Sequence, residues 1–200
     1  MKTPIEPTIF EYKILGSKFI GLLFPCKTIL DFENLMEKTK KEYPKATHYC
    51  YAYIIGNNKK FSDDGEPNGT AGKPMLNILE KNETTNTLLI IVRYFGGTKL
   101  GAGRLERTYA LVASSSISQG IYGEYIFGKE VEIELPYSLF DSLKKKMDVM
   151  GIDIKEKEFS SLVKLTCLVD DKIIDTFVSS LPYEAKCEIK NNVEFVRRER

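Results

Sequence analysis

The alternation of hydrophobic and polar residues predicts a mixed α+β fold for the first 128 residues. Two apolar stretches between Glu11 and Phe24 are broken at Gly16-Ser17, which predicts a β-hairpin. The run from Leu88 to Val92 is continuously apolar, so residues 87–95 are expected to form a strand that is buried on both faces. A further strand, rich in Tyr and Ile, is expected at residues 48–55. Helical patterns cover residues 31–42, 74–81 and 103–119.

The rest of the chain has a different pattern, with the order β-α-β-β-α-β that is typical of a ferredoxin-like domain. The predicted strands are residues 131–135, 152–159, 162–169 and 185–196, and the predicted helices are residues 138–150 and 171–181. Gly123 and Gly128 interrupt the segment between the two patterns. We therefore expect two domains, residues 1–128 and residues 129–200.

Composition narrows the class of protein. The chain has 200 residues, 42% of them hydrophobic and 28% charged, which is typical of a soluble globular protein. No apolar run approaches the 18 residues of a membrane-spanning helix, so no membrane association is expected. The four cysteines are scattered without a C-x-x-C pair, which indicates reduced, buried thiols and neither a disulfide framework nor a metal site. We expect a cytoplasmic protein.

Charge alone does not indicate nucleic-acid binding. The net charge is +1, with 16 Lys and Arg against 13 Asp and Glu up to Gly128, and 13 against 15 afterwards. Phosphate contacts need clustered cations, so any nucleic-acid surface would be a local patch on the first domain.

Two glycine-rich segments, residues 61–74 and 93–103, provide such a candidate patch. Each precedes a predicted helix, where free backbone N–H groups suit an anion such as phosphate. Neither segment has the spacing of a P-loop or of G-x-G-x-x-G, so no nucleotide cofactor is predicted. Tyr94 and Phe95 offer flat faces for stacking on a base, although one of them would be a core residue if they alternate across the strand. The predicted ligand- or RNA-binding residues are Gly69, Thr70, Gly72, Lys73, Arg93, Tyr94, Gly96, Gly97, Lys99, Gly101, Gly103 and Arg104.

A cluster of acidic residues near the single histidine is the candidate for catalysis. Asp63, Asp64 and Glu66 are suited to acid/base chemistry or to binding Mg²⁺, but they equally suit a turn around Gly65. His48 lacks the H-x-E and P-C-x-x-C motifs of a zinc deaminase, and the chain has no G-x-S-x-G motif. We interpret the cluster as structural and assign no catalytic residue and no metal ligand.

Three runs of sequence resemble the IMPACT/YigZ family: H-Y-C-Y-A-Y (48–53), F-S-D-D-G-E-P-N-G-T-A-G-K-P (61–74) and V-R-Y-F-G-G-T-K-L-G-A-G-R-L-E-R-T-Y (92–109). The resemblance covers residues 16–120 and departs from the family pattern at Arg104-Leu105-Glu106, which follow Gly103. The residues that match the family pattern are His48, Asp63, Asp64, Gly65, Glu66, Pro67, Gly69, Thr70, Gly72, Arg93, Tyr94, Gly96, Gly97, Lys99, Gly101, Gly103 and Tyr109.

The resemblance implies a two-layer α/β sandwich, similar to a domain of a small-subunit ribosomal protein and of elongation factor G. It also implies a ferredoxin-like accessory domain, as in bacterial YigZ proteins. Eukaryotic relatives regulate translation initiation through a kinase pathway that bacteria lack, so only a broader link to RNA or the ribosome carries over.

Our hypothesis from sequence is a non-catalytic regulator of translation that binds RNA or the translation machinery. One alternative is an enzyme acting on a phosphorylated small molecule, with Asp63, Asp64 or His48 as acid or base. The other is a protein-interaction regulator that uses an exposed apolar patch on the sheet of the second domain.

Overall fold

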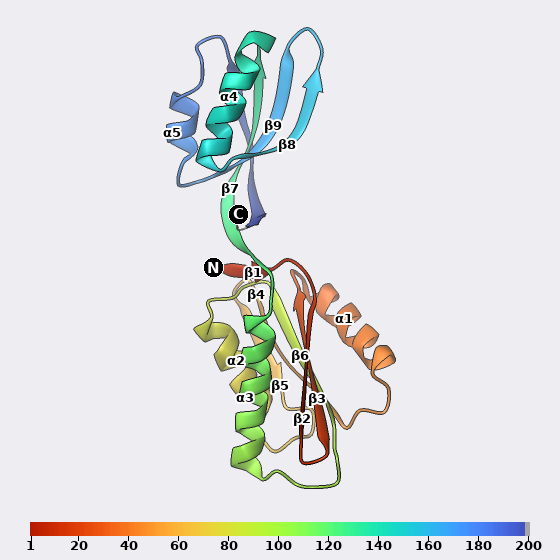
Figure 1. The fold of residues 1–200 in the computed structure, drawn as a ribbon. Coiled ribbons are helices and arrows are strands. Elements are labelled where there is room, and N and C mark those ends of the chain that lie inside the picture. Colours follow the sequence, from red (N-terminus) through yellow and green to blue (C-terminus); the bar gives the residue numbers. More distant parts are fainter. Residues whose placement is uncertain (199–200) are drawn as a thin grey trace. The chain divides into compact units, whose positions relative to one another are not determined.

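A computed structural model describes residues 1–198, and the chain divides into two compact units (Figure 1). Unit 1 contains Met1–Glu124 and unit 2 contains Tyr125–Arg197. This division lies four residues before the predicted boundary, within strand β7 (Tyr122–Leu135). Gly128 is part of that strand, where a Cβ atom would lie 2.2 Å from the carbonyl oxygen of Val169. It therefore permits close approach of strands and does not mark a linker.

Unit 1 is built on a five-stranded antiparallel sheet with the order β2-β3-β6-β4-β5. The strands are β2 (Thr8–Ile14), β3 (Ser17–Pro25), β4 (His48–Ile55), β5 (Asn58–Ser62) and β6 (Thr87–Tyr94). The predicted hairpin is confirmed as β2 and β3. The central strand β6 is buried over Thr87–Arg93, as its continuous apolar run predicts. A short strand β1 (Lys2–Pro4) pairs with the start of β7.

Strand β5 is absent from the sequence prediction. It follows β4 through a two-residue turn, Gly56-Asn57, because Ile55 pairs with Asn58. Gly56 has a positive φ of 53°, which such hairpin turns require. The Gly-Asn pair directly after a strand was the sequence signal for this hairpin.

Helices cover both faces of the sheet in unit 1 (Figure 1). Helices α2 (Gly72–Lys81) and α3 (Ala102–Ser118) bury Met75, Leu79 and Val112 against one face. On the other face, α1 (Ile29–Glu42) packs Phe32, Leu35 and Met36 against a second cluster. Helix α1 thus adds a third layer to the sandwich that the family resemblance implies.

Unit 2 has the predicted order β-α-β-β-α-β. Its elements are β7, α4 (Tyr137–Met150), β8 (Asp153–Phe159), β9 (Val163–Asp170), α5 (Ile174–Ser179) and β10 (Lys186–Arg198). Strand β7 pairs with both β9 and β10, and β8 is an edge strand beside β9. One face of the sheet packs on α4 and α5 around a core that includes Val131, Leu165, Met147 and Phe177.

Helix α5 is shorter than the predicted helix at residues 171–181. The side chain of Asp170 accepts the N–H of Lys172 at 2.9 Å, and its carbonyl accepts the N–H of Ile173 at 3.0 Å. These bonds form a turn in place of the first helical turn.

The face of the unit 2 sheet that is turned away from the helices carries charged side chains at its centre. Glu132 and Glu134 on β7 neighbour Thr166 and Lys164 on β9. Lys164 lies 2.8 Å from Glu134. At these paired positions of β7 and β9 the face is therefore polar, and it does not offer the apolar patch that a protein-interaction regulator would need. None of the helices in residues 1–198 has the length and apolar character needed to span a membrane.

Candidate functional site

Three parts of the sequence motifs meet at one end of the unit 1 sheet. Strand β6 lies between β3 and β4, so Arg93 is the register partner of both Phe19 and His48. The first glycine-rich segment follows β5, and its Glu66 contacts Arg93 at the same place. Arg93, the first residue of the second glycine-rich segment, therefore meets Glu66, in the middle of the first segment, at this end of the sheet.

The carboxylate of Glu66 is the centre of this buried network. Its Oε1 accepts a hydrogen bond of 2.6 Å from the Arg93 guanidinium and one of 2.8 Å from the Tyr109 hydroxyl. Glu66 and Arg93 are only 8% and 4% exposed, and the Arg93 guanidinium carbon lies 5.1 Å from the centre of the Phe19 ring. Arg93 is therefore an interior ion-pair partner and not an exposed cation.

Asp63 occupies the place that sequence analysis predicts for a bound anion. One carboxylate oxygen accepts the N–H groups of Ala71 and Gly72 at 2.9 and 2.8 Å, and the other accepts the N–H of Gly69 at 2.8 Å. Ala71 and Gly72 begin α2, which has no side-chain cap of its own. The helix N-terminus in the first segment is thus already neutralised by a carboxylate of the same chain.

Asp64 and His48 close the other side of the turn. The Asp64 carboxylate accepts the N–H of Tyr49 at 2.6 Å, and the Asp64 carbonyl lies 2.8 Å from Nδ1 of His48. That carbonyl can only accept, so Nδ1 carries a proton and donates it. Nε2 then faces Oε2 of Glu66 at 3.6 Å.

Two neutral groups, the Cys50 thiol and the Tyr109 hydroxyl, also contact this network. Cys50 Sγ donates to the Asp63 carbonyl at 3.0 Å and lies 3.3 Å from the Tyr109 hydroxyl. Burial raises the pKa of the Cys50 thiol and that of the Tyr109 phenol far above their ordinary values. Both groups therefore stay protonated and serve as hydrogen-bonding groups, not as nucleophiles.

Among the residues that the structure describes, no side chain caps the N-terminus of α3, which follows the second glycine-rich segment. Gly101 is the N-cap residue, no side chain caps the helix, and its first turn contains no acidic residue. Arg104 lies in that turn, and Lys99 precedes it; both are exposed. Cations are unfavourable beside a helix N-terminus unless an anion binds there as well.

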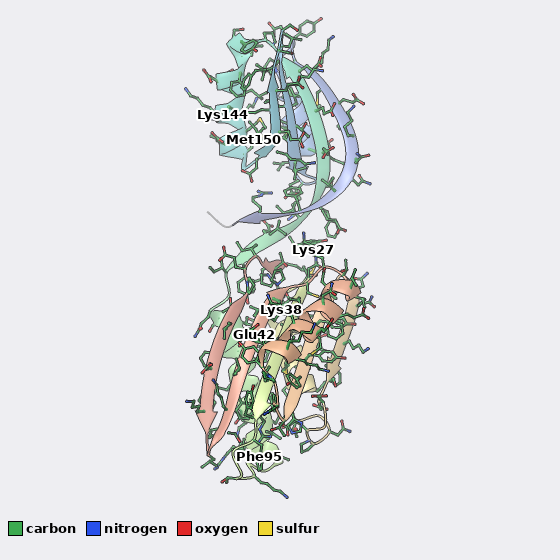
Figure 2. All side chains as sticks on the ribbon, turned by 90° about the vertical axis from the view of Figure 1, so that its right-hand side faces the viewer. Lys27, Lys38, Glu42, Phe95, Lys144 and Met150 are labelled. Atoms are coloured by element: carbon green, nitrogen blue, oxygen red, sulfur yellow. The ribbon has the colours of Figure 1, made fainter. Side chains whose placement is uncertain are left out.

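The aromatic pair next to this segment has separate roles. Tyr94 packs on the α1 side of the sheet, where its hydroxyl donates to the Pro44 carbonyl at 3.2 Å. Phe95 follows β6 at the end of the sheet and is 43% exposed (Figure 2). Of the two rings, Phe95 is the one that a ligand can reach.

Five of the seven glycines in the two segments fall into two groups. A Cβ atom on Gly96 would lie 1.9 Å from the backbone of Gly16, and one on Gly72 would lie 2.7 Å from the backbone of Ser62. These two glycines permit contacts within the protein. Positive φ angles explain a second group, in which a Cβ atom would meet no atom within 4 Å; its members are Gly69, Gly97 and Gly101.

The predicted binding residues thus do not form a single set. Gly69, Gly72 and Arg93 have internal partners, and Thr70 bonds to the Pro67 carbonyl. Lys73 is exposed, with its ammonium 5.9 Å from the centre of the Phe61 ring. Gly103 lies beside Arg104 in the open first turn of α3. Sequence reasoning missed the pairing of Glu66 with Arg93 and Tyr109. These partners are separated from Glu66 by 27 and 43 positions in the chain, and no local sequence pattern signals contacts over such separations.

Within residues 1–198, no group of three or more His, Cys, Asp or Glu side chains is arranged to hold a metal ion.

Comparison with known proteins gives consistent matches. The Impact N-terminal domain family model matches residues 15–117. IMPACT family member YvyE of Bacillus subtilis (strain 168) is 34% identical over 170 residues, covering 84% of this chain and 78% of that protein. IMPACT family member YigZ of Escherichia coli (strain K12) is 35% identical over 121 residues, covering 58% of this chain and 59% of that protein. A crystal structure of a hypothetical protein matches with a TM-score of 0.64 and 26% identity over 89% of both chains.

Proposed function

The chain belongs to the IMPACT family, and we propose that it is a non-catalytic regulator of translation that binds RNA or the ribosome. The proposed contact is the α3 anion surface, which we define as Phe95, Lys99, Gly101, Gly103 and Arg104. The observation that carries the proposal is the uncapped N-terminus of α3, which is flanked by cations and lacks an acidic residue. A phosphate would accept the free N–H groups and offset both positive charges.

The contrast among the three helices of unit 1 supports this choice of site. Helix α1 begins with a capping box in which Thr28 and Asp31 satisfy the first N–H groups. Helix α2 begins at the carboxylate of Asp63. Helix α3 has neither arrangement, so its first turn is the one left for an external anion.

Phe95 favours RNA over a small phosphorylated molecule as the ligand. Its exposed ring follows directly on β6 and precedes the cations of the surface. Every base can stack on an aromatic side chain. Stacking on Phe95 therefore suits a protein whose cations contact the phosphate backbone of RNA without regard to its sequence.

The contacts of the acid cluster, Asp63, Asp64 and Glu66, give less support to the alternative that the protein is an enzyme. Each of its three carboxylates accepts hydrogen bonds from the protein: Asp63 from backbone N–H groups, Asp64 from Tyr49, and Glu66 from Arg93 and Tyr109. A general base needs a free lone pair within reach of a substrate proton. These contacts favour a structural role for Asp63, Asp64 and Glu66.

The proposal is tested by crosslinking in native cells, with sequencing of the bound RNA and co-sedimentation with ribosomes. We expect the wild-type chain to recover RNA, and the Lys99→Ala/Arg104→Ala variant to lose most of it. Lys60→Ala, at an exposed lysine of β5, is the matched control and should behave as the wild type. Equal recovery by all three proteins would contradict the proposed surface.

A further inference from the structure

The exposed ring of Phe95 is held against the buried network of unit 1. The Arg93 guanidinium carbon lies 5.5 Å from the centre of the Phe95 ring and 5.1 Å from the centre of the buried Phe19 ring. Arg93 is itself fixed by its ion pair with Glu66. A guanidinium attracts an aromatic face, and the attraction is stronger where water is excluded, as it is around Arg93. One face of the Phe95 ring is therefore anchored to the protein interior.

The backbone beside the Phe95 ring is fixed as well. The N–H of Phe95 donates to the Thr47 hydroxyl at 2.9 Å, and the N–H of Gly96 donates to the Ser17 hydroxyl at 3.2 Å. The Ser17 hydroxyl also accepts a hydrogen bond of 3.4 Å from the Arg93 guanidinium. These contacts exist without a ligand, so binding on the ring has less conformational freedom to remove.

The rest of the Phe95 ring is open to a ligand. The residue is 43% exposed although the Arg93 guanidinium lies over one face of its ring. The exposed area therefore belongs to the opposite face and the ring edges, at the end of the sheet (Figure 2). A base inside a double helix is already stacked on its neighbours, so only an unpaired base can place its own face on such a ring.

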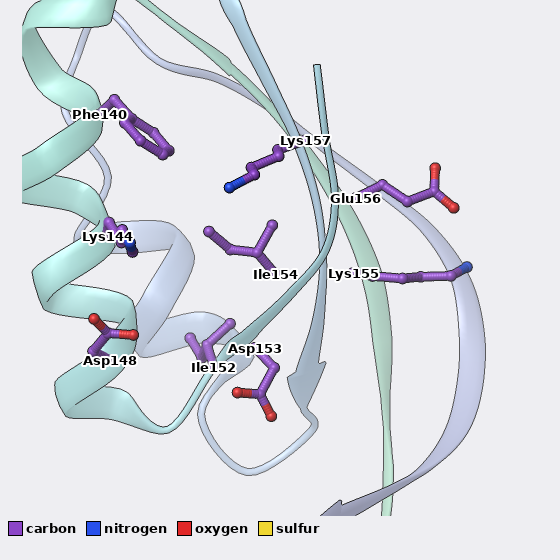
Figure 3. Close-up of a pocket in the computed structure, with 9 residues that line it drawn as sticks. All are labelled: Phe140, Lys144, Asp148, Ile152, Asp153, Ile154, Lys155, Glu156 and Lys157. Carbon is purple, nitrogen blue, oxygen red and sulfur yellow. The ribbon is translucent and has the colours of Figure 1, made fainter. Parts of the chain in front are cut away.

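The groove between α4 and β8 in unit 2 does not offer a comparable site for RNA. Its wall carries three ammonium groups and three carboxylates (Figure 3). They belong to Lys144, Lys155, Lys157, Asp148, Asp153 and Glu156. Charges of both signs in equal number do not attract a phosphate backbone as clustered cations do. We therefore place the contact with a base on unit 1.

We propose that Phe95 stacks on an unpaired base of single-stranded RNA. Arg93, Ser17 and Thr47 are positioning residues that hold the ring for this contact. The inference rests on the proposed function, in which the cations of the α3 anion surface contact the phosphates, and it adds a preference for single strands over duplexes. It also gives the buried pair of Glu66 and Arg93 a second role, because the pair keeps a guanidinium against the ring that contacts RNA.

The ligand class is tested by fluorescence anisotropy, with the full chain titrated into a labelled single-stranded RNA and into a labelled duplex of the same sequence. Phe95→Leu should weaken single-strand binding about tenfold, the order expected for one lost base–aromatic stack, and leave duplex binding unchanged. Phe61→Leu is the matched control. Phe61 is 39% exposed on the edge strand β5, and its ring lies 5.9 Å from the Lys73 ammonium. This control should bind both RNAs as the wild type does.

A double-mutant cycle tests the positioning role. Thr47→Val removes the hydroxyl that accepts the Phe95 N–H, at an exposed position. It should weaken single-strand binding about threefold in the wild type and cause no further loss in the Phe95→Leu background. Arg93→Lys keeps a positive charge opposite Glu66 but removes the planar group from the ring, and it should behave in the same way. Thr47→Val provides the test by itself if Arg93→Lys does not fold.

The outcomes separate this inference from the proposed function. Unchanged single-strand binding by Phe95→Leu, equal losses for single strand and duplex, or additive losses in the cycle would each overturn the inference. In those cases the phosphate contacts of Lys99 and Arg104 would still stand. A wild type that binds neither RNA would overturn the proposed function and the inference together.

Discussion

At the scale of single residues, the arrangement of charges decides which glycine-rich segment is open to a ligand. Both segments have similar sequence features: glycines, cations and a following helix. The difference is that Asp63 returns to the N-terminus of α2, whereas no acidic residue lies in the first turn of α3. Sequence predicts an anion site in both segments, but it does not reveal that Asp63 already accepts the N–H groups of Gly69, Ala71 and Gly72, because that depends on how residues 63–72 turn.

Asp63→Asn should lower the free energy of unfolding by about 2 kcal/mol, the usual value for hydrogen bonds to a charged group. An amide offers one acceptor oxygen, so the N–H groups of Gly69, Ala71 and Gly72 cannot all keep their partner. Urea denaturation at neutral pH measures the change. Asp141→Asn, at an exposed position of α4, is the control and should leave the midpoint unchanged. Equal midpoints for both variants and the wild type would mean that this carboxylate does not hold the turn.

Glu66→Gln should cost about 3 kcal/mol of unfolding free energy, because it leaves the buried guanidinium of Arg93 without a counter-charge. Glu37→Gln removes the carboxylate of the exposed pair with Lys41 and is the matched control. The control should show no measurable loss in the same denaturation experiment. If the two variants lose the same stability, the Glu66–Arg93 pair does not stabilise the fold in the way that its burial implies.

At the scale of elements, strongly periodic or continuously apolar segments were predictable, and short segments were not. Strand β4 has the predicted limits, and α1, α3 and α4 differ from prediction by only a few residues. Strand β5 has four exposed residues among its five and so lacks the apolar pattern that identifies a strand. Helix α5 was predicted too long because local hydrogen bonds of Asp170 compete with the first helical turn.

The N-terminus of α1 gives a pH-dependent prediction. Burial alone would raise the pKa of Asp31, but hydrogen bonds from Thr28 and Lys27 outweigh it and hold the pKa below its ordinary value. The stability that Asp31 contributes is therefore complete above the unfolded pKa of about 3.9 and is lost as the pH falls through the lower folded pKa. Asp31→Asn should be less stable than the wild type at pH 7, and this difference should shrink at lower pH. Urea midpoints across the acid range measure it, and a constant difference would contradict the capping role.

At the scale of the whole molecule, each unit has its own hydrophobic core. The core of unit 2 is formed by residues from within that unit. They lie on β7, β9, α4 and α5 and in the segments that adjoin these elements. We predict that residues 125–198 fold independently, although a chain of this length has a small stability margin. Circular dichroism of that fragment should show cooperative thermal unfolding. A poorly dispersed NMR spectrum would indicate that unit 2 needs the rest of the chain to fold.

The function that we propose for the whole molecule rests on the α3 anion surface, and the salt dependence of RNA binding tests that proposal most directly. A single-stranded RNA oligonucleotide is titrated with the wild type, Lys99→Ala, Arg104→Ala and the control Lys60→Ala at several salt concentrations. For each of the first two variants, the slope of log K against log salt should become shallower by about 0.7, the value for one lost phosphate contact on a single strand. The Lys60→Ala slope should equal that of the wild type. Identical slopes for all four proteins, or no RNA binding by the wild type, would contradict the account.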